Sequence, residues 1–256
     1  MSGDPAVDLA IIGGTGLYDF PGLEKVETRS VETPFGAASD AITLGELHGK
    51  RVAFLARHAV GHSIPPHRIN YRANIWALHR LGARLVVGVN AVGGIRADMG
   101  PRALVVADQI IDYTHGRLSS FCDVDGAKVE HVDFTEPYSA KLRADLIAAA
   151  ARADVAVVAG GCYGVTQGPR LETAAEIARL RRDGCALVGM TGMPEAVLAR
   201  ELDIHYACLA VVANWAAGCG PATGSGQATP ISLAEIFAHL EAATAQVPPI
   251  ISALLA

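Results

Sequence analysis

The sequence is poor in charged and aromatic residues. Of its 256 residues, 18% are charged and 5% aromatic, and the formal net charge is −5. Because proteins that bind nucleic acids or anionic membranes present a basic surface, this balance argues against polyanionic partners. The hydrophobic content of 51% excludes disorder, which combines low hydrophobicity with high charge. Length and composition together favour a globular protein with a large buried core.

Signals for export, membrane insertion and disulfide bonding are also missing. The N-terminus has no basic segment followed by a long apolar stretch, and no uncharged apolar run reaches the roughly 18 residues of a membrane helix. The five cysteines are odd in number and include no CxxC pair. We therefore expect a cytoplasmic protein with reduced thiols and no membrane partner.

Short apolar runs, rich in β-branched residues, predict buried strands. They lie at residues 8–12, 51–56, 85–90, 103–107, 155–159, 186–190 and 206–213. Because these runs lack polar alternation, they are typical of a sheet that is covered on both faces.

Helical patterns lie between the predicted strands. They cover residues 71–81, 140–151, 173–182 and 194–202, and a last helix from about Ser232 that is interrupted at Pro248 and Pro249. Alternating strands and helices predict an α/β fold with three layers. The Gly-, Ser- and Pro-rich segment 218–228 is predicted to be a surface loop, and no linker divides the chain, so we expect one domain over residues 1–256.

A glycine-rich turn follows the first predicted strand. In the segment Gly13-Gly14-Thr15-Gly16, backbone N–H groups can approach an anion closely, and Thr15 adds a hydroxyl donor. The turn lacks the last glycine of the GxGxxG pattern that binds dinucleotides. An anion cradle is favoured, and a simple tight turn and a dinucleotide site both remain open.

Arg57 and His58 follow the predicted strand 51–56. The planar guanidinium of Arg57 suits a phosphate group. The HxxxH spacing of His58 and His62, with His67 nearby, is compatible with a metal site only on a helix. The intervening glycine and prolines argue against such a helix, so we expect no metal.

Three more polar motifs stand at predicted strand ends, in the segments 164–173 and 189–195 and at Asn214. Each has a structural explanation. Thr173 and Glu176 fit a helix capping box, the proline and glutamate of the second motif suit a first helical turn, and a strand-end asparagine often forms a turn. The sequence has no nucleophile elbow and no glycosidase-type carboxylate pair. Taken together, the motifs predict a site for an oxyanion beside a polar ring.

Six motifs in order resemble the family of trimeric purine nucleoside phosphorylases and methylthioadenosine phosphorylases. They are IIGGTG (11–16), TPFG (33–36), ARH (56–58), NYRANIWAL (70–78), GPRLET (168–173) and MTGMPE (190–195). The resemblance spans about Ile11 to Leu240. It implies a single-domain phosphorylase fold with a mixed central sheet flanked by helices on both faces, and a homotrimer. It also implies phosphorolysis of a purine nucleoside with inorganic phosphate as co-substrate and no cofactor.

The resemblance assigns roles to individual residues. It implies phosphate binding by Thr15, Arg57, His58, Asn90, Ala91 and Thr191. It implies contacts to base and ribose by Met190, Leu171, Glu172, Asn214 and Ala216, and it gives catalytic roles to His58, Glu172 and Asn214. His131 matches a histidine that approaches the 5′ end of a neighbouring subunit's nucleoside. Methylthioadenosine members usually carry threonine where Asn90 stands, whereas the backbone N–H of Ala91 keeps its role.

Glu172 and Asn214 depart from the pattern of adenosine-type members, which carry Asp-x-Asp at the strand end and serine before the helix. Hypoxanthine and guanine have a proton on N1, which the Glu172 carboxylate can accept, whereas adenine has a bare lone pair there. The Asn214 amide can donate to O6 or N7. Because an unpaired buried polar group costs about 1–3 kcal/mol, the pair predicts a 6-oxopurine base.

Ile231 stands where nucleoside-type members carry a polar residue, often histidine, near the start of the last helix. An apolar side chain suits a 5′-methylthio group, and the stretch 188–202 also resembles the methylthioinosine branch of the family. The resemblance thus implies phosphorolysis of S-methyl-5′-thioinosine to hypoxanthine and 5-methylthioribose 1-phosphate in purine salvage. The alternatives are an inosine/guanosine phosphorylase, then a methylthioadenosine phosphorylase and, from another class, an NAD-dependent oxidoreductase.

Overall fold

The computed structural model describes residues 6–123, 128–220 and 232–256. Its strands are β1 (Leu9–Gly13), β2 (Glu24–Arg29), β3 (Ile42–Leu47), β4 (Lys50–Ala56), β5 (Leu85–Gly94), β6 (Leu104–Val106), β7 (Gln109–Asp112), β8 (Val158–Ala159), β9 (Cys162–Val165), β10 (Cys185–Gly189) and β11 (His205–Trp215). Its α-helices are α1 (Tyr71–Arg80), α2 (Ala140–Arg152), α3 (Ala174–Arg182), α4 (Glu195–Glu201), α5 (Leu233–Thr244) and α6 (Val247–Leu255), and 3-10 turns lie at Val60–His62 and Pro66–Arg68.

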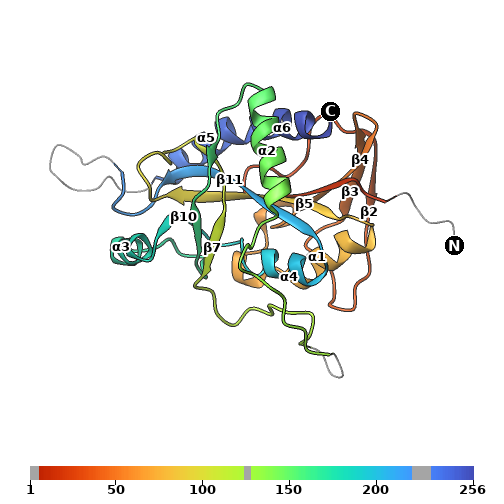
Figure 1. Cartoon of the computed structure of the whole chain (residues 1–256), viewed down its shortest axis with the longest axis horizontal. Coiled ribbons are helices and arrows are strands. Elements are labelled where there is room, and N and C mark those ends of the chain that lie inside the picture. Colours follow the sequence, from red (N-terminus) through yellow and green to blue (C-terminus); the bar gives the residue numbers. More distant parts are fainter. Residues whose placement is uncertain (1–5, 124–127, 221–231) are drawn as a thin grey trace.

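The described strands form one mixed sheet, as predicted (Figure 1). The order along its main path is β2-β3-β4-β1-β5-β10-β9-β7, and β11 and β6 continue from β5 on a branch. Strand β5 is the junction, because it pairs in parallel with β1 and β11 and, at its end, antiparallel with β10. Several loops that follow strands therefore meet around the end of β5.

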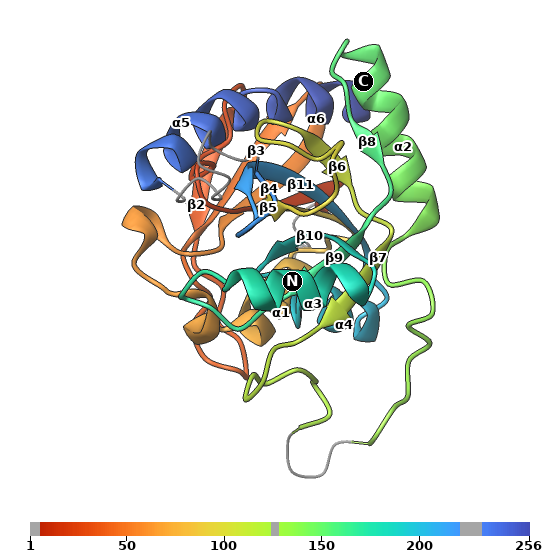
Figure 2. The same ribbon diagram turned by 90° about the vertical axis from the view of Figure 1, so that its left-hand side faces the viewer.

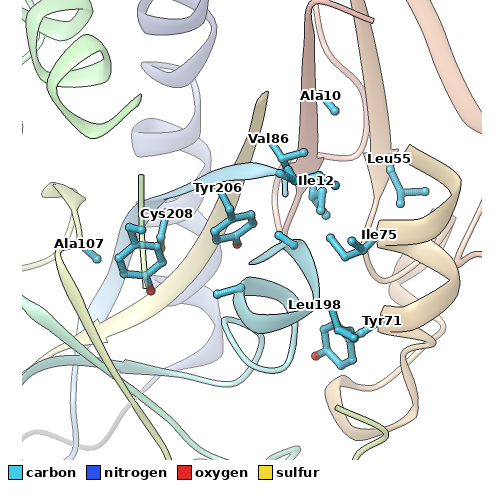
Figure 3. Packing of buried hydrophobic residues seen from close by; sticks show 14 of the residues in the cluster. Ala10, Ile12, Leu55, Tyr71, Ile75, Val86, Ala107, Leu198, Tyr206 and Cys208 are labelled. Atoms are coloured by element: carbon cyan, nitrogen blue, oxygen red, sulfur yellow. The ribbon is translucent and has the colours of Figure 1, made fainter. Parts of the chain in front are cut away.

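Helices cover both faces of the sheet, which is why its central strands, such as β1 and β11, are apolar and buried. Alternate residues of β1 point to opposite sides. Leu9 and Ile11 pack in a cluster with residues of α2, α5 and α6, whereas Ala10 and Ile12 pack in a second cluster with residues of α1 and α4. Figure 3 shows part of this second cluster, and Figure 2 shows the two helical layers on either side of the sheet.

All seven predicted strands and all the predicted helices are present, with ends that shift by up to four residues. The sequence analysis missed β2, β3, β7 and β9. Strand β2 is exposed and mostly charged, and β7 and β9 have only four residues each. None of these three strands therefore produces a long apolar run. Pro248 and Pro249 lie in the first turn of α6, where a missing N–H costs nothing, so they begin a helix instead of interrupting one.

Two predictions concern the thiols and the membrane. All five cysteines are free, which confirms the prediction of unpaired thiols. None of the helices in the described part of the chain has the length and hydrophobicity that a bilayer crossing requires. Most of the predicted loop 218–228 lies outside the described residues.

Candidate active site

A cavity of about 460 Å³ opens where β1, β5, β10 and β11 end. Many of the residues singled out in the sequence line it together. They are Thr15, His58, Ala91, Leu171, Glu172, Met190, Thr191, Asn214 and Ala216. Most of them come from loops that follow different strands, so the sheet topology is what gathers them at the carboxyl edge of a buried sheet, where α/β proteins bind their ligands.

The glycine-rich turn lies directly against the end of β5. A Cβ atom added to Gly14 would stand 2.7 Å from the carbonyl oxygen of Val89 and 3.0 Å from Nη1 of Arg57, so this position has room only for glycine. The same point is 3.6 Å from the backbone nitrogen of Ala91. Thr15 follows immediately, so its hydroxyl and the Ala91 N–H lie at the same end of the cavity.

Thr191 adds a second hydroxyl to this donor end. The residue is buried, and its Oγ1 accepts a hydrogen bond of 2.9 Å from the amide of Asn90. Asn90 is itself fully buried and does not line the cavity. The structure therefore places Asn90 behind Thr191, where it contacts the hydroxyl that was predicted to bind phosphate.

Arg57 also lies behind the cavity wall. Its fully buried guanidinium makes two hydrogen bonds of 2.8 Å to the carboxylate of Glu195 and donates to the carbonyls of Val89 and Ile12. Burial by itself lowers the pKa of Arg57, but the charge and hydrogen bonds of Glu195 outweigh this effect and raise it. Of the five guanidinium protons, only one on Nη1 is left for a ligand. Direct phosphate binding by Arg57 stays a prediction, and it would use that single proton.

Glu195 is a residue whose importance the sequence analysis missed. It begins α4, as a first-turn glutamate should, but its carboxylate is fully buried. Besides Arg57, it accepts a hydrogen bond of 2.7 Å from the hydroxyl of Tyr206. The sequence contains no local signal for this ion pair, because its two partners are 138 residues apart.

His58 is neutral and has a defined tautomer. Its Nδ1 lies 2.8 Å from the backbone carbonyl of Ile64, which can only accept, so Nδ1 carries the proton and Nε2 keeps its lone pair. Burial and, to a smaller extent, the charges of Arg57 and His62 lower the pKa of His58 to about 4, although the hydrogen bond to Ile64 acts in the opposite direction. The His58 and His62 rings lie 4.3 Å apart. Within the described residues, no three or more His, Cys, Asp or Glu side chains form a group that suits a metal ion.

Glu172 and Asn214 form the other polar part of the cavity. Asn214 is paired with Gly93 of β5, two residues beyond Ala91 on the same strand. The register of β11 shifts between Val212 and Asn214. Such a bulge re-aims side chains, and both Ala213 and Asn214 line the cavity although consecutive strand residues normally face opposite sides.

The predicted capping box at the start of α3 is present. The Thr173 hydroxyl accepts from the backbone of Glu176, whose carboxylate accepts from the backbone of Thr173. This cap does not use Glu172, which is half-buried and faces the cavity. The structural explanation of the motif and its ligand-binding explanation are therefore compatible.

His131 is a third predicted residue that does not line the cavity, besides Asn90 and Arg57. His131 is exposed on the segment between β7 and α2, whose described parts project from the body of the molecule (Figure 2). Ile231 lies outside the described residues. The cavity also contains residues that the sequence analysis did not assign to the site, including His62, Ser63 and, from α5, Ile236 and Leu240. Ile236 and Leu240 are four residues apart and so share a helix face, a spacing that a search for apolar positions could have found.

One cavity lined by hydroxyl, amide, imidazole and carboxylate groups characterises an α/β enzyme that binds an anion beside a polar ring. Comparison with known families agrees. The family model of the phosphorylase superfamily matches residues 8–256. The chain belongs to the phosphorylase superfamily.

Curated relatives and solved structures resemble the chain over most of its length. A probable S-methyl-5′-thioinosine phosphorylase from Xanthomonas campestris is 57% identical, over 97% of each chain. A 6-oxopurine nucleoside phosphorylase from Pyrococcus furiosus is 50% identical, over 82% of this chain and 80% of the relative. The crystal structure of a methylthioadenosine phosphorylase from an antarctic soil metagenomic library superimposes with a TM-score of 0.88, at 39% identity, over 97% of this chain and 85% of its own.

Proposed function

We propose that the chain phosphorolyses S-methyl-5′-thioinosine to hypoxanthine and 5-methylthioribose 1-phosphate. The observation that carries this proposal is that one cavity holds Glu172 and Asn214 together with the anion-binding end of Thr15, Ala91 and Thr191. The name of the Xanthomonas campestris relative supports the same reaction.

Phosphate is the nucleophile in this proposal. One of its oxygens attacks C1′ while the bond from C1′ to the purine nitrogen breaks, and the electron pair of that bond passes to the purine ring. The hydroxyls of Thr15 and Thr191 and the N–H of Ala91 donate to phosphate and hold it against the sugar. Nε2 of neutral His58, which has a lone pair, accepts a hydrogen bond from the hydroxyl of hydrogen phosphate. The proton that the phosphate loses after its oxygen bonds to C1′ balances the proton that the departing purine nitrogen gains. The phosphate charge stabilises the positive charge that develops on the sugar.

Glu172 and Asn214 bind the base. Glu172 accepts the N1 proton of a 6-oxopurine. Asn214 donates one amide proton to the carbonyl of Trp215 at 2.6 Å, which fixes the side chain and leaves the second proton for the base. The second proton forms a hydrogen bond to O6 or N7 of the purine, where negative charge grows as the purine leaves.

The apolar face of α5 supports a 5′-methylthio substituent. Ile236 and Leu240 line the cavity, and Leu240 lies beside the glycine-rich turn, because a Cβ atom on Gly16 would be 3.6 Å from its Cβ. His62 and Ser63 line the same cavity and give a 5′-hydroxyl possible partners. An inosine/guanosine phosphorylase is therefore the second candidate.

A substrate comparison tests the proposal. Phosphate-dependent release of base is measured from methylthioinosine, inosine and methylthioadenosine, with phosphate-free reactions as blanks. We expect methylthioinosine to have the highest kcat/KM. Equal or faster turnover of inosine would overturn the methylthio assignment, and a preference for methylthioadenosine would overturn the roles of Glu172 and Asn214.

The variant Ile236→Thr sharpens the 5′ assignment. It should lower kcat/KM for methylthioinosine about tenfold relative to inosine, because one apolar contact contributes about 1–3 kcal/mol to discrimination. Phe237→Ala is the matched control, since Phe237 is the next residue of α5 but is exposed and does not line the cavity. If Ile236→Thr leaves the ratio of kcat/KM for methylthioinosine and inosine unchanged, α5 does not contact the 5′ substituent.

We also propose that the enzyme is a cytoplasmic homotrimer that requires no cofactor. The projecting segment between β7 and α2 carries the exposed apolar residues Leu118 and Val129, together with His131, and would reach a second copy of the chain. Light scattering should give three times the mass of the chain. Full activity after exhaustive dialysis against a chelator, with phosphate restored, would support the absence of a cofactor.

A further inference from the structure

Thr166 stands behind the carboxylate that faces the base. It follows the last residue of β9 and does not line the cavity. Its hydroxyl donates a hydrogen bond of 2.5 Å to Oε1 of Glu172. The sequence analysis gave Thr166 no role, and the proposed reaction does not use it.

The backbone of Thr166 is fixed from two sides. Its N–H donates to the carbonyl of Gly189 at 2.8 Å, and its own carbonyl accepts from Nη2 of Arg117 at 3.3 Å. Arg117 also donates to the carbonyl of Met190, so one guanidinium connects the loop after β9 with the loop after β10. Thr166 is therefore held in a set position beside Glu172.

A hydroxyl has one proton, and two acceptors compete for this one. Oε1 of Glu172 lies at 2.5 Å, whereas the carbonyl of Gly189 lies at 3.4 Å and already accepts the N–H of Thr166. The geometry therefore directs the proton to Glu172. In this hydrogen bond Glu172 is the acceptor, and its second carboxylate oxygen is left to accept from a ligand.

The direction of this hydrogen bond bears on which purine the site accepts. An ionised Glu172 can pair with a base that has a proton on N1, and it repels a base with a lone pair there. If the Thr166 hydroxyl pointed away, this contact would no longer hold the carboxylate of Glu172 in place as an acceptor for the N1 proton. The two orientations of the Thr166 hydroxyl should differ in how well the site binds each purine class. This difference is large enough to select one class, because a buried polar mismatch is costly in binding free energy.

We propose that Thr166 is a specificity-determining positioning residue, whose hydroxyl holds Glu172 as an acceptor and so selects 6-oxopurine over 6-aminopurine nucleosides. This inference rests on the proposed function, in which Glu172 faces the base. Thr166 itself touches neither substrate, and it acts through the carboxylate.

The test compares Thr166→Val, which keeps the shape and loses the hydroxyl, with Thr166→Ser, which keeps the hydroxyl. For each enzyme, kcat/KM is measured with methylthioinosine and with methylthioadenosine at one neutral pH. We expect Thr166→Val to lower the ratio of the two values by about tenfold. Thr166→Ser should keep the wild-type ratio, and the KM for phosphate should not change in either variant.

The outcomes separate this inference from the function on which it rests. A wild-type preference for methylthioinosine that Thr166→Val retains would overturn the role of Thr166 alone, as would an equal loss of selectivity in Thr166→Ser. A wild-type preference for methylthioadenosine would overturn the proposed function and this inference with it. If Thr166→Val does not fold, Thr166→Ala carries the same comparison.

Discussion

The amide of Asn90, which is fully buried, donates a hydrogen bond of 2.9 Å to the hydroxyl oxygen of Thr191, which lines the cavity. The bond joins the middle of β5 to the loop after β10. Because it occupies a lone pair of Thr191 Oγ1, it helps to orient the hydroxyl proton toward another acceptor. In the proposed reaction that acceptor is phosphate, so Asn90 acts on phosphate through Thr191.

Replacement of Asn90 with alanine should therefore weaken phosphate binding. We expect Asn90→Ala to raise the KM for phosphate about tenfold, the equivalent of ~1.4 kcal/mol for one oriented hydrogen bond. Thr191→Val is the comparison, and the double variant should be no worse than Thr191→Val alone, because both changes remove the same contact. Fully additive losses in steady-state kinetics would contradict the coupling of the two residues.

Asn214→Ala tests transition-state stabilisation at the base. The Asn214 hydrogen bond to O6 or N7 strengthens as negative charge develops, so its loss should lower kcat more than it weakens substrate binding. We expect a fall in kcat of about 100-fold, which is the usual cost of one removed donor of this kind. A variant in which only KM changes would show that Asn214 binds the ground state and the transition state equally.

The stability of the protein should depend on pH through His58. Burial lowers the pKa of His58 from 6.5 to about 4 in the folded protein. Below pH 6.5 the unfolded chain therefore binds a proton that the folded protein does not bind until about pH 4, so stability falls as the pH drops through this window. The loss between about pH 7 and about pH 5 amounts to about 2 kcal/mol.

His58→Gln removes this titration. The free energy of unfolding, measured with urea at both pH values, should fall less in His58→Gln than in the wild type. His62 lies beside His58, so His62→Gln is measured in parallel; the histidines that do not contact His58 cancel in the difference. Parallel losses in the two proteins would mean that His58 is not the group responsible.

Loss of Glu195 should destabilise the fold strongly. Glu195→Gln leaves the charge of Arg57 buried without its partner, which costs about 3–5 kcal/mol. Tyr206→Phe removes only the hydroxyl that donates to Glu195 and should cost about 1–2 kcal/mol. Urea unfolding of both variants measures the difference, and a cost for Glu195→Gln as small as that for Tyr206→Phe would show that the ion pair is weakly stabilising.

Much of the site could be predicted because its motifs are short and continuous. Thr15 lies inside a glycine-rich turn, and Glu172 and Thr191 lie inside runs that follow apolar strands, so a local reading of the chain finds them. Direct contacts were also predicted for Arg57, with phosphate, and for His131, with the nucleoside of a neighbouring subunit. The structure places His131 on a projecting segment and Arg57 behind the wall, since the positions of both depend on distant parts of the chain.

The supporting residues could not be predicted in this way. Asn90 and Thr191 are 101 residues apart, and nothing in the sequence near either residue indicates their hydrogen bond. The bulge that turns Asn214 toward the cavity depends on how β11 pairs with β5. Thr166 is an ordinary strand-end residue until the turn after it brings Glu172 back to its hydroxyl.

The sequence by itself determined the class of fold and the kinds of group at the strand ends, because apolar runs, helix caps and turns are set by neighbouring residues. It also determined that the chain is poor in charge, and a site made of hydroxyls, amides and one carboxylate is consistent with that. Only the tertiary structure decided which groups face the ligand and which hold them in place. The physical reason is that hydrogen bonds and ion pairs form between atoms that are close in space, and the sheet brings together residues that are far apart in the chain.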